Sequence, residues 1–198
     1  MRLKKAISWL VKQWKKFIIA IILLIIVVYY AGTYILDMAG LDHPLVGIKA
    51  PDITIKKLDG TEVSLSSFAG KKAIVLDFWA TWCGPCQKAL PAMEKLARRY
   101  DPNQVAFLAI NVWDGDVDAI KDFIKENDIK TVNMFLEKLE EKTDDNRSME
   151  TSNKFMFRGI PAIFVLDSNL KIQCYYSGYS PFLDWIIGRR IDKLVFVN

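Results

Sequence analysis

The feature that most constrains this chain is an apolar run near its N-terminus. Residues 17–36 contain no charged side chain and consist mainly of isoleucine, leucine and valine. An α-helix needs roughly 20 such residues to cross the hydrocarbon layer of a membrane. Basic residues precede the run, and the first acidic residue, Asp37, follows it. We therefore predict a basic cytoplasmic segment at 1–16, a single transmembrane anchor at 17–36, and the rest of the chain on the periplasmic, extracytoplasmic side of the cytoplasmic membrane.

A cleavable signal peptide is the alternative interpretation of the same run. Signal peptides have a shorter apolar core and a cleavage site of the small-x-small type. The small residues Ala31, Gly32, Ala39 and Gly40 do not have that spacing. The sequence therefore favours an uncleaved anchor.

The distribution of charge argues against a nucleic-acid-binding protein. The chain carries a formal net charge of +4, from 27 basic and 23 acidic residues. Six of the basic residues lie in the first sixteen positions, which contain no acidic residue. The rest of the chain is therefore slightly acidic, and it lacks the basic surface that nucleic acids require.

The remaining residues predict a short tether followed by one α/β domain. Residues 37–50 contain Gly40, Pro44 and Gly47 with little periodicity, which indicates a tether in which His43 is an exposed loop residue. Within the domain at 51–198, strands are expected at 53–56, 62–65, 73–79, 105–112, 132–136, 162–166 and 171–176, and helices at 83–100, after Asp116, and at 181–193. The first two strands form a hairpin around Asp59 and Gly60. This order predicts a mixed central sheet with helices on both faces.

Cys83 and Cys86 carry the chemistry that the sequence indicates most clearly. They lie at the turn from a buried strand into a helix, where unpaired backbone N–H groups and the helix dipole favour a thiolate. Cys83, the outer residue, can attack a disulfide, and Cys86 can resolve the mixed disulfide. The same spacing also occurs in zinc sites, but only Cys174 and His43 are available as further ligands of the usual kind. We therefore expect no metal and no cofactor beyond a redox-active disulfide.

Asp77 is an unexpected carboxylate in the apolar strand that leads to the cysteines. Burial should raise its pKa, because it penalises the charged form. Asp77 could then accept the proton of Cys86 when the mixed disulfide is resolved. The alternative is a structural carboxylate paired with Lys88.

Two other features have less definite interpretations. Residues 137–146 are highly charged without an apolar face, which is typical of a solvated loop or a helix end. Cys174 lies in the predicted strand 171–176 as a packed or half-exposed thiol.

Two segments of the chain resemble the thioredoxin family. Residues 77–86, DFWATWCGPC, resemble its active-site segment, and residues 158–161, RGIP, resemble its cis-proline loop. The resemblance implies a thioredoxin fold, a cis peptide bond at Pro161, and a substrate groove lined by Ile160. It also implies that Trp82, Gly84 and Pro85 contact the substrate beside Cys83.

The leading hairpin and the anchor resemble the TlpA, ResA and CcmG branch of that superfamily. Members of the branch keep cysteines reduced outside the cytoplasm, often for cytochrome c maturation. Several carry a glutamate three residues after the second cysteine, where this chain has Ala89. The resemblance implies a reductase that acts on disulfides of exported proteins and draws electrons from a membrane donor. A disulfide oxidase or isomerase, and a non-catalytic membrane-tethered binding or copper-delivery module, are the alternatives.

Overall fold

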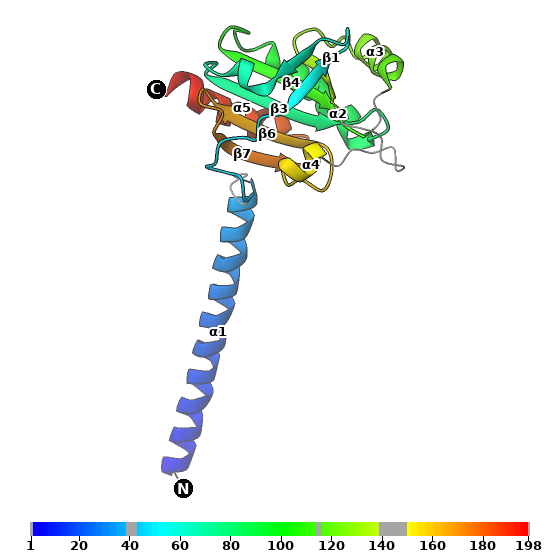
Figure 1. Cartoon of the computed structure of the whole chain (residues 1–198). Coiled ribbons are helices and arrows are strands. Elements are labelled where there is room, and N and C mark those ends of the chain that lie inside the picture. Colours follow the sequence, from blue (N-terminus) through cyan, green and yellow to red (C-terminus); the bar gives the residue numbers. More distant parts are fainter. Residues whose placement is uncertain (1, 39–42, 114–115, 139–149, 198) are drawn as a thin grey trace. The chain divides into compact units, whose positions relative to one another are not determined.

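The computed structural model describes residues 2–38, 43–113, 116–138 and 150–197, which form two compact units (Figure 1). The first unit is a single helix, α1 (Arg2–Met38). Its stretch Gln13–Ala31 is long and apolar enough to cross a membrane, and none of the side chains in that stretch is buried. The helix includes all of the predicted span and continues into the first residues of the predicted tether.

The second unit is built on a seven-stranded sheet with the order β2-β1-β5-β4-β3-β6-β7. The strands are β1 (Thr54–Lys57), β2 (Glu62–Ser64), β3 (Ala73–Trp79), β4 (Val105–Asn111), β5 (Asn133–Glu137), β6 (Ala162–Asp167) and β7 (Ile172–Ser177). The central strands β3, β4 and β5 are parallel, and the outer pairs are antiparallel. The predicted mixed sheet and the leading hairpin are therefore confirmed, and the hairpin extends the sheet at the edge next to β5.

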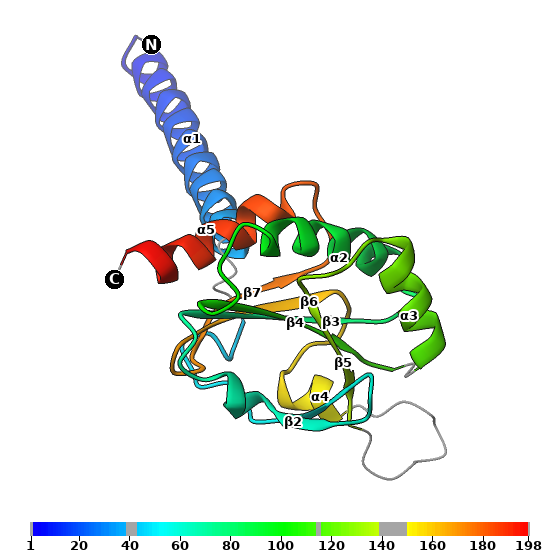
Figure 2. The same ribbon diagram turned by 90° about the horizontal axis from the view of Figure 1, so that it is seen from above.

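Helices cover both faces of the sheet, as the sequence predicts. Figure 2 shows α2 (Gly84–Ala97), α3 (Val117–Glu126) and α5 (Leu183–Phe196) on one side and α4 (Glu150–Lys154) on the other. A short 3-10 helix, η1 (Leu65–Phe68), joins the second side and buries Leu65 there. Both α4 and η1 are too short to show a helical period, so the sequence does not reveal them.

The side chains of β3 alternate between the two layers of the core. Val75 and Trp79 pack toward α2 and α5, whereas Ile74 and Phe78 pack into the layer on the opposite face. Successive side chains of a strand point to opposite faces of the sheet. Asp77 therefore lies on the α2 side, in the layer that also holds Cys86.

Residues 43–50 belong to the folded domain, although the sequence assigns them to a tether. Gly47 N donates to the carbonyl oxygen of Ile172, and Ala50 N donates to that of Leu170, both at 2.8 Å. His43 is only 8% exposed, and its ring lies 4.3 Å from that of Tyr175. The expectation of an exposed His43 is therefore wrong. Residues 43–50 show no helical or strand period in the sequence. Their conformation is set by backbone hydrogen bonds to residues 170–172, which are far away in the sequence.

Candidate active site

Cys83 and Cys86 form a disulfide at the start of α2, with Cα atoms 5.2 Å apart. A turn after β3, in which Cys83 N donates to the carbonyl oxygen of Ala80, makes Cys83 the N-cap residue of the helix. Cys83 is 5% exposed and Cys86 is fully buried. Cys83 is thus the less buried residue of the pair.

The backbone around Cys83 favours a negative charge on its sulfur. Cys86 N donates to Cys83 Sγ at 3.2 Å, and the N-terminus of α2 adds the positive end of the helix dipole. Gly84 and Pro85 form the first turn of the helix, and both are exposed. Pro85 has no N–H group, but the first turn would leave that group unpaired in any case. A Cβ atom on Gly84 would meet no described atom within 4 Å apart from those of its chain neighbours and its own helix backbone, so the space beside the disulfide is open.

The segment that resembles a cis-proline loop lies beside the disulfide. The Ile160–Pro161 peptide bond is cis, as the resemblance implies. The carbonyl oxygen of Ile160 is 3.6 Å from Cys83 Sγ. This proximity follows from the sheet, because Ala162 at the start of β6 pairs with Phe78 near the end of β3.

Asp77 is buried, and neither of its carboxylate oxygens has a hydrogen-bond partner among the described residues. Its side chain is flanked in the sheet by Ala109 and Ile163, and the residue is 3% exposed. Burial raises the pKa of the Asp77 carboxyl to about 8. Lys88 is exposed and forms no ion pair with it, so the structural pairing that the sequence left open is not present.

Two tryptophans form an aromatic surface beside the disulfide, and a third lies below it in the core. Trp82 is 58% exposed, and its ring stacks on that of Trp113, with centroids 6.5 Å apart. Trp113 in turn packs against Phe157, which leads into the cis-proline loop. Trp79, the last residue of β3, is fully buried. Sequence analysis missed Trp113, because only the parallel pairing of β4 with β3 places the end of β4 at this site.

The other features singled out by the sequence lie apart from the disulfide. Cys174 in β7 is 2% exposed, and burial raises the pKa of its thiol to about 11, so it is packed and unreactive. Of residues 137–146, only 137 and 138 are among the described residues. Glu137 ends β5 and accepts a hydrogen bond from Thr151 N. Within the described ranges, no three His, Cys, Asp or Glu residues are arranged to hold a metal ion.

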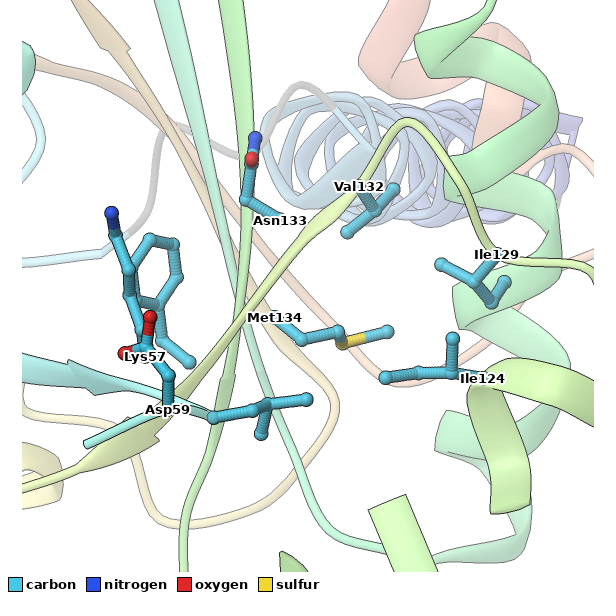
Figure 3. Close-up of a pocket in the computed structure, with 9 residues that line it drawn as sticks. Lys57, Asp59, Ile124, Ile129, Val132, Asn133 and Met134 are labelled. Atoms are coloured by element: carbon cyan, nitrogen blue, oxygen red, sulfur yellow. The ribbon is translucent and has the colours of Figure 1, made fainter. Parts of the chain in front are cut away.

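One cleft lies between the end of α3, the start of β5 and the turn of the hairpin (Figure 3). Its volume is about 440 Å³. Ile124, Ile129 and Met134 contribute apolar side chains, and Lys57 and Asp59 lie on the opposite side. None of the lining residues belongs to the disulfide or to the cis-proline loop, so we assign this cleft no role in the chemistry.

Comparison with known proteins identifies relatives of the domain. The model of the AhpC/TSA family matches residues 46–175. The thioredoxin-like protein YneN of Bacillus subtilis (strain 168) is 41% identical over 107 residues, which cover 52% of this chain and 58% of YneN. The thiol-disulfide oxidoreductase ResA of Bacillus thuringiensis subsp. konkukian (strain 97-27) is 36% identical over 85 residues, which cover 43% of this chain and 48% of ResA. The chain thus spans about half the length of these curated relatives.

Solved structures share the fold. A crystal structure from Chlorobium tepidum, assigned as a thiol:disulfide interchange protein DsbE, superposes with a TM-score of 0.62 at 27% identity. The match covers 75% of this chain and 96% of that chain. The thioredoxin-like fold implied by residues 77–86 and 158–161 is therefore confirmed.

Proposed function

Because the chain belongs to the AhpC/TSA family and has a thioredoxin-like fold, we propose that it is a thiol-disulfide oxidoreductase that reduces disulfides in exported proteins. The observation that carries the proposal is the Cys83–Cys86 disulfide at the start of α2, with Cys83 facing the carbonyl of Ile160. The names of the relatives, a thiol-disulfide oxidoreductase and an interchange protein, support the same chemistry.

The reaction begins from the reduced pair. The Cys83 thiolate attacks one sulfur of a substrate disulfide, which forms a mixed disulfide and releases the first substrate thiolate. Cys86 then loses its proton and attacks Cys83 Sγ, which breaks the mixed disulfide and releases the second substrate thiolate. Two electrons pass from the pair to the substrate, whose thiolates take up protons from water. The pair ends as the disulfide, and a membrane electron donor must reduce it before the next cycle.

Asp77 is the proton acceptor in the second step of this scheme. It lies on the same side of the sheet as Cys86, and both residues are buried. A carboxyl group with a pKa of about 8 can both accept and return a proton near neutral pH. Its position and its pKa both suit this role.

The substrate lies over the surface formed by Trp82, Gly84, Pro85 and the cis-proline loop. An extended peptide there can pair with the backbone of Ile160 while its cysteine approaches Cys83. Trp82 offers a broad aromatic surface to the residues beside that cysteine. This geometry suits protein substrates rather than small thiols.

We place the domain on the periplasmic, extracytoplasmic side of the cytoplasmic membrane, anchored by α1. The length and composition of Gln13–Ala31 support the span, and the basic residues before it support a cytoplasmic N-terminus. Exported proteins with disulfides are then the available substrates. Apocytochrome c is one such substrate class, and the resemblance of the leading hairpin and the anchor to the TlpA, ResA and CcmG branch favours it.

The reduction potential of the Cys83–Cys86 pair tests the direction of the reaction. The full chain in detergent is equilibrated with glutathione buffers, and the free thiols are trapped and counted by mass spectrometry. A reductase should have a potential near that of thioredoxin, about −270 mV. A potential near about −120 mV, as in strong oxidants, would instead make the protein a disulfide donor.

Replacement of Cys83 by serine tests whether exchange is the function at all. Cys83→Ser should abolish reduction of a protein disulfide, whereas Cys174→Ser, at a buried thiol away from the site, should leave the rate unchanged. A non-catalytic binding module would keep its cellular phenotype in Cys83→Ser. An exchange enzyme would lose it.

A further inference from the structure

The outward side of α5 carries a continuous row of aromatic and basic side chains. The row, here called the α5 stripe, consists of Phe182, Trp185, Arg189, Lys193 and Phe196, and all five are exposed. Their spacing of three and four residues places them on one side of the helix. The three aromatic side chains are 53–71% exposed. The opposite side of α5 is the one that the core buries, so packing within the domain does not explain the stripe.

The charges around the stripe are predominantly positive. The Arg189 guanidinium lies 5.1 Å from the centroid of the Trp185 ring, in a cation–π contact. The two acidic residues of α5, Asp184 and Asp192, are only half-exposed. Asp192 accepts a hydrogen bond from the Tyr100 hydroxyl at 2.8 Å, which holds it beside the neighbouring helix.

We propose that the α5 stripe docks on the anionic lipid surface of the membrane that α1 crosses. Exposed tryptophan and phenylalanine combined with arginine and lysine are typical of helices that lie in a membrane interface. Anionic headgroups attract the basic side chains, and the aromatic rings enter the boundary between headgroups and acyl chains. The inference rests on the proposed membrane anchor and adds a second point of contact to it.

The connection between the two units makes such docking intramolecular. Seven residues of α1 follow Ala31, which is a rise of about 10 Å. Five Cα–Cα steps join Met38 to His43 and can reach at most about 18 Å, so the chain itself limits how far the domain can move from the end of α1. A weak lipid contact is then strengthened by a high effective concentration of membrane surface. A soluble protein partner would have no such advantage.

The test uses the full chain in lipid nanodiscs that contain anionic lipid and a fraction of spin-labelled lipid. A fluorophore is attached to Val197→Cys, next to the stripe, in the oxidised protein. Labelling is confined to that position because Cys83 and Cys86 are bonded to each other and Cys174 is buried. The variant Arg189→Glu/Lys193→Glu reverses the charge of the stripe. The control Lys121→Glu/Lys125→Glu makes the same change of net charge on the exposed side of α3.

Docking predicts that the spin-labelled lipid quenches the fluorophore strongly. Quenching should fall about threefold or more in the stripe variant, in purely zwitterionic lipid and at high salt, because each weakens the attraction to headgroups. The α3 control should be quenched like the parent. Unchanged exchange of a soluble protein disulfide verifies that each variant is folded.

Three results would overturn the inference. An unquenched fluorophore on a chain retained by the nanodiscs would show that the stripe does not touch lipid and serves a protein partner instead. Equal quenching in the two charge-reversed variants would mean that the tether alone brings the domain close. Loss of the chain from the nanodiscs would overturn the membrane anchor together with the docking, while the exchange activity would still report separately on the disulfide.

Discussion

Two buried carboxyl groups of this protein, those of Glu94 and Asp77, have pKa values shifted in opposite directions. Glu94 is 3% exposed and accepts hydrogen bonds from Arg98 Nε and from the backbone N–H groups of Thr131 and Val132. Burial alone would raise the pKa of Glu94, but these hydrogen bonds hold it below the ordinary value. Asp77 has no such partners, and its pKa is raised to about 8. Their opposite pKa shifts predict opposite effects on folding.

Asp77→Asn should stabilise the domain at neutral pH. The folded state binds a proton on Asp77 up to about pH 8, whereas the unfolded state loses it near 3.8, so stability falls as the pH rises between these values. Removing the group should raise the free energy of unfolding by up to about 4 kcal/mol at pH 7 and by less at pH 5. Urea unfolding at both values measures this. A gain that does not depend on pH would contradict the pKa shift.

The same substitution should also slow turnover. In the proposed cycle, the asparagine side chain of Asp77→Asn cannot accept the proton of Cys86, so the mixed disulfide with substrate should persist. Rapid acid quenching followed by mass spectrometry would detect the trapped species. Rates of resolution equal to those of the parent at every pH would exclude Asp77 as the proton acceptor.

Glu94→Gln should have the opposite effect on stability. The amide cannot accept all the hydrogen bonds that the carboxylate accepts, so the free energy of unfolding should fall by about 1–3 kcal/mol at pH 7. The contribution of the ionised group is present above pH 4.5 and is lost as the pH falls through its lower folded pKa. The difference between parent and variant should therefore shrink in acid. A difference that is constant with pH would attribute the loss to packing instead.

At the scale of elements, the contact between α2 and α5 depends on a glycine. A Cβ atom at Gly188 would lie 3.2 Å from Leu96 Cδ1, which is closer than most such contacts. Leu96 is fully buried, and the Tyr100 hydroxyl oxygen of the segment after α2 lies 3.3 Å from the Gly188 carbonyl oxygen. The two helices are thus packed too closely for a branched side chain.

Gly188→Val should lower the free energy of unfolding by about 1–3 kcal/mol, because the added methyl groups push α5 away from α2. Lys121→Val, at an exposed position of α3, is the control for the effect of helix propensity alone. It should lower the free energy of unfolding by less than about 1 kcal/mol. Thermal unfolding followed by circular dichroism compares the two variants. Equal losses would show that the α2–α5 contact can relax.

The sequence predicts those features that are determined by residues close together in the chain, and it misses those that depend on contacts between distant segments. The apolar strand at 73–79 and the cap of α3 by Asp116 are predicted correctly, because periodicity and capping act within a few residues. The burial of His43 and the stacking of Trp113 on Trp82 are not predictable in this way. Both depend on strands that are distant in the sequence and become neighbours only in the sheet. The same holds for the lack of a partner for Asp77.

At the scale of the whole molecule, the proposed anchor makes a prediction about membrane extraction. The parent chain should stay in the membrane pellet after an alkaline carbonate wash. Ile22→Asp/Ile25→Asp places two charges near the middle of Gln13–Ala31, each costing roughly 3 kcal/mol of insertion free energy. This variant should move to the supernatant, whereas Ile22→Val/Ile25→Val should not. Retention of the charged variant would mean that another part of the chain holds it to the membrane.

Residues 43–50 can take their place in the folded domain only after β7 has been synthesised. Lys49 forms an isolated antiparallel β-bridge with Lys171, and Gly47 N donates to the carbonyl oxygen of Ile172. The part of the domain that is synthesised first therefore pairs with the start of its last strand, β7. Until β7 has emerged from the ribosome, residues 43–50 have no strand to pair with. A chain released before that point keeps an open sheet edge, which is a site for association with other chains. Closing the domain is therefore a late event, and prematurely terminated chains are the ones that we expect quality-control proteases to remove.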